Sequence, residues 1–467
     1  MIRRGLNGGT FAGAMLAAVF AIVAIAPRAY ALEIKRMTLS NGAVLLVSEE
    51  HELPMVTVSI AFDAGARRDP DGKAGLAALT AQCLGQGTRS LSAADFNQKV
   101  DFMGSSVEVG ADRDYAVAGF TSLKKYQDDT MALMAGILTE PGLRDADIER
   151  KRAETIADIH AQEEEPGYTA SVKFQKALFG DTPYGHPEDG SAESVAKLTP
   201  DDVRAFYRNH YKLGSAVIAV TGDVRADEIK ASLEKSLTGM AGTVAAQAVP
   251  PAPPAPKGLE AKLIDRSVQQ ANIIMGFGGI ARSNPDFYKL QVMNYIFGGG
   301  GFASRLVQVV RSEHGLAYSV GSVVSAGKFE GAYGIRLQTK NSSANDAIKL
   351  ILEQMRIMQE HPVTDAELDG AKKFLIGSFP LKFDRQSAIA GFMLGIELNG
   401  LGLDYADRYP KLIQAVTKED VQDMARKYLH PDAILLVAVA NLKDAAINTA
   451  MLSQIAAGDS AAAPAKQ

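Results

Sequence analysis

The chain has 467 residues, which at roughly 100–200 residues per domain excludes a single small module. Apolar residues make up 47% and charged residues 22%, a composition typical of globular proteins. The formal net charge is −5 and no long run of one sign occurs, which argues against a nucleic-acid-binding surface. A single cysteine, Cys83, excludes an intramolecular disulfide and a cysteine-based metal cluster.

Residues 1–31 have the pattern of an export signal. Arg3 and Arg4 precede an apolar stretch, and Ala29-Tyr30-Ala31 fits the small-x-small site that signal peptidase cuts. We therefore expect cleavage near Ala31 and a location in a bacterial periplasm. An uncleaved membrane anchor is the alternative, although the apolar stretch from Phe11 to Pro27 only reaches the lower limit of about 17 residues for a span.

The next segment begins with strands and continues with helices. Asn41-Gly42 predicts a two-residue hairpin between strands over 34–39 and 43–48. Residues Met55 to Phe62 alternate in polarity as a further strand. Helical patterns follow over 75–83, 93–103 and 145–162.

A proline-rich run near the middle of the chain predicts a linker. The run from Val249 to Pro256 can form neither a helix interior nor a central strand, so we expect an extended linker over 246–258. It separates a first domain over 32–245 from a second domain over 259–453. Residues 454–467 are rich in small and polar residues and are expected to be a disordered tail.

The two halves contain matching segments that lie 218 residues apart without a gap. One runs from Thr199-Pro-Asp-Asp-Val203 to the apolar run 215–220, and the other from Thr417-Lys-Glu-Asp-Val421 to the apolar run 433–438. In both, a threonine N-cap and an acidic first turn begin a helix, and a short apolar strand follows. The shared pattern predicts an internal duplication.

The second half repeats the order of strands and helices. It predicts strands over 271–277 and 318–325 and, between them, helices over 286–296 and 303–313. Strands and helices clustered in this way indicate the α+β class, with two homologous domains that each contain a largely antiparallel sheet.

The helix over 75–83 carries a resemblance to a known family. The string from Gly75 to Thr88 resembles the metal-binding helix of the pitrilysin/insulinase zinc peptidases, in which Gly-Leu-Ala is followed by His-x-x-Glu-His. Four further segments are similar to segments of this family: Tyr184-Gly-His-Pro187, Asp202 to Tyr211 with Gly222-Asp223, Gly298 to Leu306, and Arg311 to Val320. The similarity covers essentially all of residues 35–450 and implies the two-domain α+β architecture of the family.

The chain departs from this family at the metal ligands. Ala78, Ala81 and Gln82 stand where the family has its first histidine, its glutamate and its second histidine. Alanine has no lone pair to donate, and glutamine is a poor zinc ligand with no useful basicity. The distal ligand of the family would fall at or near Asp158, but one carboxylate cannot hold zinc alone. We expect no metal in this chain and an inactive first domain.

The remaining histidines show no metal-binding spacing, because none forms an i, i+4 pair or a His-x-His pair, and a site assembled from distant histidines is the disfavoured alternative. They are scattered along the chain at His51, His160, His186, His210, His314, His361 and His430. His186 and His210 match family positions that look structural, so capping or turn roles are favoured for them.

The resemblance implies a role for Arg311 and Tyr318 in the second domain. In active members an arginine and a tyrosine seven residues apart come from the domain opposite the zinc and hydrogen-bond the substrate carbonyl. Such a pair stabilises the negative charge that develops on the carbonyl oxygen. Without the resemblance, a surface arginine at a helix end and a half-buried tyrosine in a sheet would be the plainer interpretation.

Gly298, Gly299, Gly300 and Gly301 resemble a short form of the glycine-rich loop of the non-catalytic subunit of mitochondrial processing peptidase. Backbone without Cβ atoms lets an extended peptide approach closely, so we predict that these glycines bind substrate. A purely structural turn is the alternative. A phosphate-binding loop is disfavoured, because no Gly-Lys-Ser/Thr follows.

These observations predict the non-catalytic subunit of a heteromeric periplasmic zinc metallopeptidase that cleaves peptides. Its partner would be a homologous subunit that carries His-x-x-Glu-His and supplies the zinc, while this chain supplies Arg311 and Tyr318. A peptide-binding or chaperone-like protein and a scaffold protein without peptidase activity are the alternatives.

Overall fold

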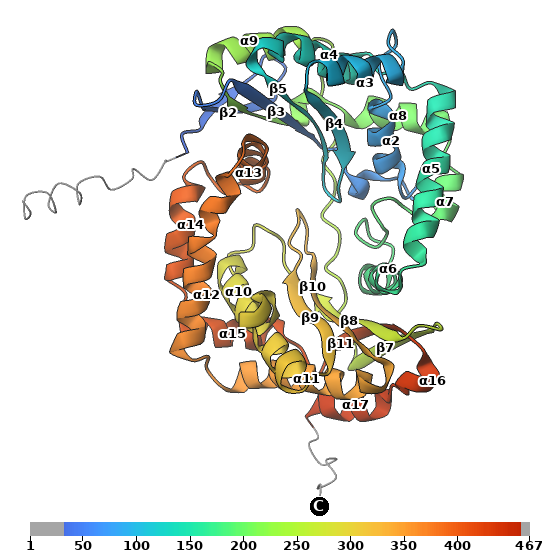
Figure 1. Cartoon of the computed structure of the whole chain (residues 1–467), viewed down its shortest axis with the longest axis vertical. Coiled ribbons are helices and arrows are strands. Elements are labelled where there is room, and N and C mark those ends of the chain that lie inside the picture. The colour runs from blue at the N-terminus through green and yellow to red at the C-terminus, as the bar shows by residue number, and fades with distance from the viewer. Residues whose placement is uncertain (1–31, 459–467) are drawn as a thin grey trace, which may run out of the picture. The chain divides into compact units, whose positions relative to one another are not determined.

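The computed structural model describes residues 32–458. The first half consists of β1 (Lys35–Thr38), β2 (Val44–Glu49), β3 (Met55–Phe62), η1 (Ala66–Arg68), α2 (Leu76–Leu84), α3 (Ala93–Phe102), β4 (Ser106–Ala111), β5 (Ala116–Leu123), η2 (Lys124–Tyr126), α4 (Gln127–Thr139), α5 (Asp145–Glu163), α6 (Pro166–Phe179), α7 (Ala192–Ala196), α8 (Pro200–His210), η3 (Leu213–Ser215), β6 (Val217–Gly222) and α9 (Ala226–Ser236) (Figure 1).

The second half consists of β7 (Leu259–Asp265), β8 (Gln270–Gly278), α10 (Phe287–Asn294), the π-helical turn η4 (Tyr295–Gly299), η5 (Gly301–Ala303), the π-helix η6 (Val307–Glu313), β9 (Ala317–Val324), β10 (Ala332–Lys340), η7 (Asn341–Ser343), α11 (Ala344–Glu360), α12 (Asp365–Gly377), η8 (Phe379–Phe383), α13 (Gln386–Leu398), α14 (Tyr405–Gln414), α15 (Lys418–Tyr428), β11 (Ile434–Ala440), α16 (Leu442–Ala445) and α17 (Thr449–Ala457).

The two sheets have the same topology. The first has the strand order β1-β2-β6-β3-β5-β4 and the second β7-β11-β8-β10-β9, so that they match strand for strand once β1 is set aside. Each contains one parallel pair, β2 with β6 and β7 with β11, and its other pairs are antiparallel. This shared order confirms the predicted fold class, two homologous and largely antiparallel α+β domains.

The helices α8 and α15 show why the sequence repeat was visible. Thr199 and Thr417 are their N-caps, and each side chain accepts a hydrogen bond from the backbone N–H three residues later, at 3.2 Å and 3.1 Å. Asp202 and Asp420 bond back to the N-cap backbone and complete a capping box in each helix. Each helix is then followed by a fully buried strand, β6 or β11.

Most of the predicted elements lie where the sequence placed them. The hairpin over Asn41-Gly42 joins the antiparallel pair β1 and β2, and Gly42 has the positive φ of 93° that its turn requires. The expected helix over 303–313 differs, because its second part is the π-helix η6. There the backbone N–H of His314 donates to the carbonyl of Val309, five residues earlier (3.2 Å).

The predicted tail starts later than expected. Helix α17 extends to Ala457, and Ala456 is buried in the main core of the second half, so the expectation of disorder is wrong for residues 454–457. Residues 459–467 lie outside the described residues, as does the predicted export signal over 1–31. None of the helices described between residues 32 and 458 is both long and apolar enough to span a bilayer.

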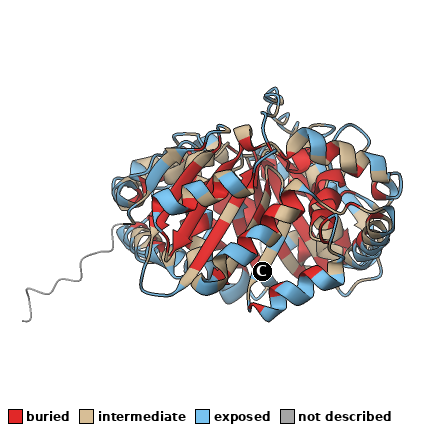
Figure 2. Ribbon diagram, turned by 90° about the horizontal axis from the view of Figure 1, so that it is seen from above, coloured by how far each residue is buried: buried red, intermediate tan, exposed pale blue. Residues whose placement is uncertain are grey.

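Each half covers part of the sheet of the other half. Helix α6 packs on β8 and β11, where Phe174 and Leu178 join Ile274 and Val437 in one apolar cluster. In return, α13 packs on β3 and β6. Figure 2 shows that buried residues concentrate on the strands and that the outer helices expose one side. Residues from Ile34 onward accordingly form one compact unit.

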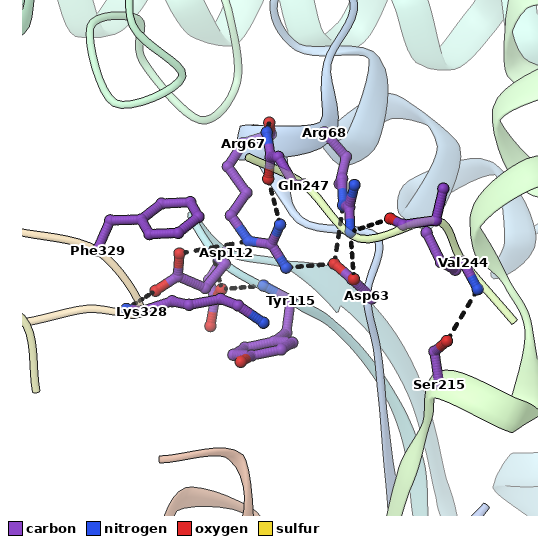
Figure 3. A network of polar contacts seen from close by, with 12 residues as sticks. Asp63, Arg67, Arg68, Asp112, Tyr115, Ser215, Val244, Gln247, Lys328 and Phe329 are labelled. Carbon is purple, nitrogen blue, oxygen red and sulfur yellow. Dashed lines mark hydrogen bonds and ion pairs between the residues drawn. The ribbon is translucent and has the colours of Figure 1, made fainter. Parts of the chain in front are cut away.

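A buried arginine joins the two halves to the chain between them (Figure 3). The Arg67 guanidinium is hydrogen-bonded to Asp63 and to Gln247, which precedes the proline-rich run. It also lies 5.8 Å from the ring centroid of Phe329, in the loop between β9 and β10. The proline-rich run itself forms neither helix nor strand. The exact domain boundaries at 245, 258 and 453 stay predictions.

Candidate functional site

Helix α2 corresponds to the helix that carries the metal ligands in the pitrilysin/insulinase zinc peptidases. In this chain, its residues at the ligand positions are packed against their neighbours. Ala78 is buried, and the exposed fraction of Ala81 is 0%. The helix begins where the carboxylate of Asp69 accepts hydrogen bonds from the backbone N–H groups of Gly75 (2.8 Å) and Ala77 (2.7 Å). Burial raises the pKa of Asp69 to about 7, despite these bonds. At the positions of Ala78 and Ala81, α2 is therefore closed to solvent.

The residues at this place do not fit zinc. The hydroxyl of Thr155 on α5 donates to the side-chain oxygen of Gln82 (3.2 Å), so that oxygen already has a partner. Asp158 is exposed on the same helix. Burial, and then the charge of Asp158, raise the pKa of Asp189. No group of three or more His, Cys, Asp or Glu side chains that could hold a metal occurs between residues 32 and 458.

The histidines that were expected to be structural are partly buried within the fold. The Nδ1 atom of His186 lies 2.8 Å from the carbonyl oxygen of Pro187. His210 packs against the ring of Phe206, with centroids 4.4 Å apart. Burial lowers the pKa of both imidazoles, which favours their neutral form.

Arg311 and Tyr318 lie on two irregular and exposed segments of the second half. Arg311 belongs to the π-helix η6 and is exposed. The exposed fraction of Tyr318 is 70%. In the pairing of β9 with β10, Ser319 faces Gln338 and Ala317 faces Thr339, which makes Tyr318 the extra residue of a β-bulge. A bulge leaves its residue outside the ladder and redirects its side chain.

The chain between these two residues follows the expected course. Gly315 has a φ of 63° and follows the end of η6, and β9 begins at Ala317. Arg311 thus stands near a helix end and Tyr318 at the start of a strand, as the sequence predicted. The π-helical hydrogen bonding and the bulge were not predicted, because neither changes the apolar pattern enough to be seen. Both kinds of irregularity are frequent at functional sites.

Packing within the chain accounts for three of the four glycines. A Cβ atom on Gly298 would lie 2.5 Å from the Ser322 hydroxyl, and one on Gly299 would lie 2.6 Å from the amide nitrogen of Asn294. One on Gly300 would lie 2.7 Å from the carbonyl oxygen of Tyr295. These contacts support the alternative of a structural turn. Substrate binding by Gly298 to Gly301 stays a prediction.

Gly301 differs from its three neighbours. Its φ is 56°, and a Cβ atom there would meet no atom within 4 Å. Backbone conformation, rather than space, selects glycine at this position. The turn exposes Phe302, which the sequence pattern had placed in no role; its exposed fraction is 72%. No periodicity signal could have found this residue, because it lies in a three-residue turn.

Two family models match this chain. The model described as "Insulinase (Peptidase family M16)" matches residues 44–188, and the model "Peptidase M16 inactive domain" matches residues 197–375. The chain belongs to the insulinase family. Since Ala78, Ala81 and Gln82 replace the ligands and the base, it is an inactive member of that family.

Relatives of this insulinase-family chain include proteins with and without a peptidase name. It is 27% identical over 403 residues to the "Non-peptidase homolog YmxG" of Helicobacter pylori, covering 85% of this chain and 92% of that protein. It is 29% identical over 405 residues to an uncharacterized zinc protease of Streptomyces coelicolor, covering 85% and 87%.

Solved structures agree with this membership. A peptidase M16 inactive domain from Pseudomonas fluorescens is 28% identical, with a TM-score of 0.82, and the match covers 88% of this chain and 98% of that one. A protease from Helicobacter pylori shares the fold at 18% identity, with a TM-score of 0.80 and coverage of 87% and 99%.

Proposed function

We propose that this chain is the non-catalytic subunit of a heteromeric zinc peptidase that cleaves peptides in the periplasm. Its partner is a homologous subunit that carries His-x-x-Glu-His and holds the zinc. The observation that carries the proposal is a contrast within one chain: α2 has no metal ligands, whereas Arg311 and Tyr318 remain exposed on irregular backbone. The export pattern of residues 1–31 supports the location.

Arg311 and Tyr318 contribute hydrogen-bond donors to the shared site. Neither side chain has a hydrogen bond to another residue of the described range 32–458, so their N–H and O–H groups are available to a substrate carbonyl. The partner's zinc supplies water activation. As charge develops on the carbonyl oxygen, a guanidinium and a phenol stabilise it, and the loss of one such donor costs about 10²–10³ in kcat.

The test is cleavage of a fluorogenic peptide by the purified complex of both subunits. We expect Arg311→Ala to lower kcat/KM about 100-fold and Tyr318→Phe to lower it at least about tenfold. Arg208→Ala is the matched control, because Arg208 is an exposed arginine on α8, and we expect it to leave kcat/KM unchanged. If both Arg311→Ala and Tyr318→Phe have no effect, the assignment of this pair is wrong.

The separate subunits complete the test. The pure chain should bind no stoichiometric zinc and cleave no peptide, and adding the partner should restore cleavage. Stoichiometric zinc together with cleavage by the pure chain would contradict the proposal. Capture of peptide without cleavage in the presence of the partner would favour the peptide-binding alternative.

A further inference from the structure

An exposed aromatic ring stands against Arg311. The guanidinium carbon of Arg311 lies 5.1 Å from the ring centroid of Phe302. A phenylalanine that is 72% exposed contributes little to the core of its own fold. Stacking on the face of a ring restricts the rotamers of a long arginine side chain and leaves the donors at the edge of the guanidinium free. The contact therefore limits where Arg311 can place its N–H groups.

Hydrogen bonds fix the backbone turn that carries Phe302. The Ser304 hydroxyl donates to the carbonyl of Gly301 (2.7 Å), and the Ser304 backbone N–H donates to the same oxygen (3.0 Å). Arg305 then forms two hydrogen bonds to the Glu367 carboxylate on α12, at 2.6 Å and 3.0 Å. The ring of Phe302 is thus presented to solvent from a fixed turn.

Further aromatic surface adjoins this turn. The rings of Tyr295 and Phe374 lie 4.9 Å apart, and the exposed fraction of Phe374 is 55%. Gly300 lies directly against Tyr295, since a Cβ atom at this glycine would be 2.9 Å from the tyrosine ring. We call Tyr295, Phe302 and Phe374 the aromatic platform, and of these three rings Phe302 is the one that lies against the Arg311 guanidinium.

We propose that Phe302 is the positioning residue of Arg311 and that the aromatic platform receives an apolar side chain of the peptide whose carbonyl Arg311 binds. This inference rests on the proposed function and adds a preference for one class of substrate. An apolar side chain removes exposed aromatic surface from water, whereas a polar one loses part of its hydration against the faces of the rings.

The experiment measures kcat and KM of the two-subunit complex on two fluorogenic peptides that differ by leucine or glutamine beside the scissile bond. Phe302→Leu keeps an apolar side chain and removes the ring, so we expect kcat to fall about two- to fivefold on both peptides, with the leucine preference retained. Phe302→Ala should lower kcat and the leucine preference together. Phe302→Tyr should restore both.

Two controls separate positioning from a general structural effect. Phe102→Leu changes a phenylalanine of α3 that is 81% exposed, and we expect it to leave both peptides unaffected. In an Arg311→Ala background, Phe302→Leu should cause no further fall in kcat, because the side chain through which it acts is gone. Phe374→Ser should lower the leucine preference.

The outcomes distinguish this inference from the proposed function. If Arg311→Ala lowers kcat/KM but Phe302→Leu lowers kcat equally in both backgrounds or not at all, the positioning role is wrong and the proposed function stands. If Phe302→Ala and Phe374→Ser leave the leucine preference intact, the platform is not a subsite. If Arg311→Ala has no effect, this inference fails, and if Tyr318→Phe has none either, the assignment of the pair in the proposed function fails with it.

Discussion

Helix α2 and the η6–β9 segment differ in the regularity of their backbone and in the exposure of their side chains. Helix α2 is regular, its residues at the family's ligand positions are small or already hydrogen-bonded, and Ala81 is fully buried. The η6–β9 segment combines a π-helix with a β-bulge and exposes Arg311 and Tyr318, and the exposed ring of Phe302 lies against Arg311. The residues of α2 at the ligand positions are part of the packed interior, whereas the η6–β9 segment has an irregular backbone of a kind that is frequent at functional sites.

This difference agrees with the proposal that the η6–β9 segment, and not α2, contacts the substrate. Buried apolar residues stabilise a fold, whereas an exposed arginine and an exposed tyrosine on irregular backbone contribute little to it. Substitutions in α2 can test whether its residues at the ligand positions are packed in the interior. Substitutions near the glycine turn can test whether neighbouring contacts fix that turn.

The largest effect is expected from restoring the family's glutamate on α2. Ala81→Glu places a carboxylate where the exposed fraction is 0%, and it should lower the free energy of unfolding by about 2–4 kcal/mol, measured by urea denaturation. Ala153→Glu, on the exposed side of α5, is the control and should change it by less than about 0.5 kcal/mol. Equal changes in the free energy of unfolding for Ala81→Glu and Ala153→Glu would mean that position 81 is not packed in the interior.

A smaller effect is expected at the ion pair that fixes the glycine turn. Burial alone would raise the pKa of Glu367, but hydrogen bonds from Arg305 and Thr364 outweigh it and lower the pKa to about 2. Glu367→Gln should therefore cost about 1–2 kcal/mol at neutral pH, an amount reduced by partial exposure to solvent. Glu353→Gln, at a surface pair with Lys349, should cost less than about 0.5 kcal/mol.

The pH dependence of this pair has a definite sign. The pKa of Glu367 is lower in the folded chain than its ordinary value of 4.5, so the folded state binds this proton less readily than the unfolded state. Its contribution is complete above about pH 4.5 and is lost as the pH falls toward 2. The difference in stability between the natural chain and Glu367→Gln should shrink over this range; a constant difference would contradict the assignment.

The smallest effect is expected from two glycines with equal space and different backbones. Gly301→Ala forces a residue with a Cβ atom into a φ of 56° and should cost about 1 kcal/mol. Gly370→Ala, in α12 with open space around it, should instead stabilise the chain by about 0.5–1 kcal/mol. Thermal unfolding would measure both, and stabilisation by both substitutions would show that the turn at Gly301 is not fixed.

Local patterns predicted the fold well where one element determines its own conformation. Strand β3 has the predicted bounds Met55 and Phe62, and α2 is displaced by one residue from its predicted range. Capping residues and the Asn-Gly turn were reliable for the same reason, since their hydrogen bonds lie within a few residues. The repeat was visible because both halves kept these signals.

The site was less predictable, because its form depends on distant contacts. The positions of Arg311 and Tyr318 came from a resemblance, but the sequence did not show the bulge that exposes Tyr318. The glycines suggested an open loop, whereas Ser322 and Asn294 fill the space above two of them. Phenylalanine is usually buried, so the sequence alone suggests a core position for Phe302, and only the structure shows that this side chain is exposed.

The exchange of helices between the halves affects how the chain can fold during its synthesis. The face of the first sheet at β3 and β6 is covered by α13, which a ribosome completes only at residue 398, long after β6 ends at residue 222. A nascent first half therefore has a sheet without its cover, and contacts this far apart in sequence form slowly. Under the proposed export to the periplasm, such a delay would keep folding from competing with translocation.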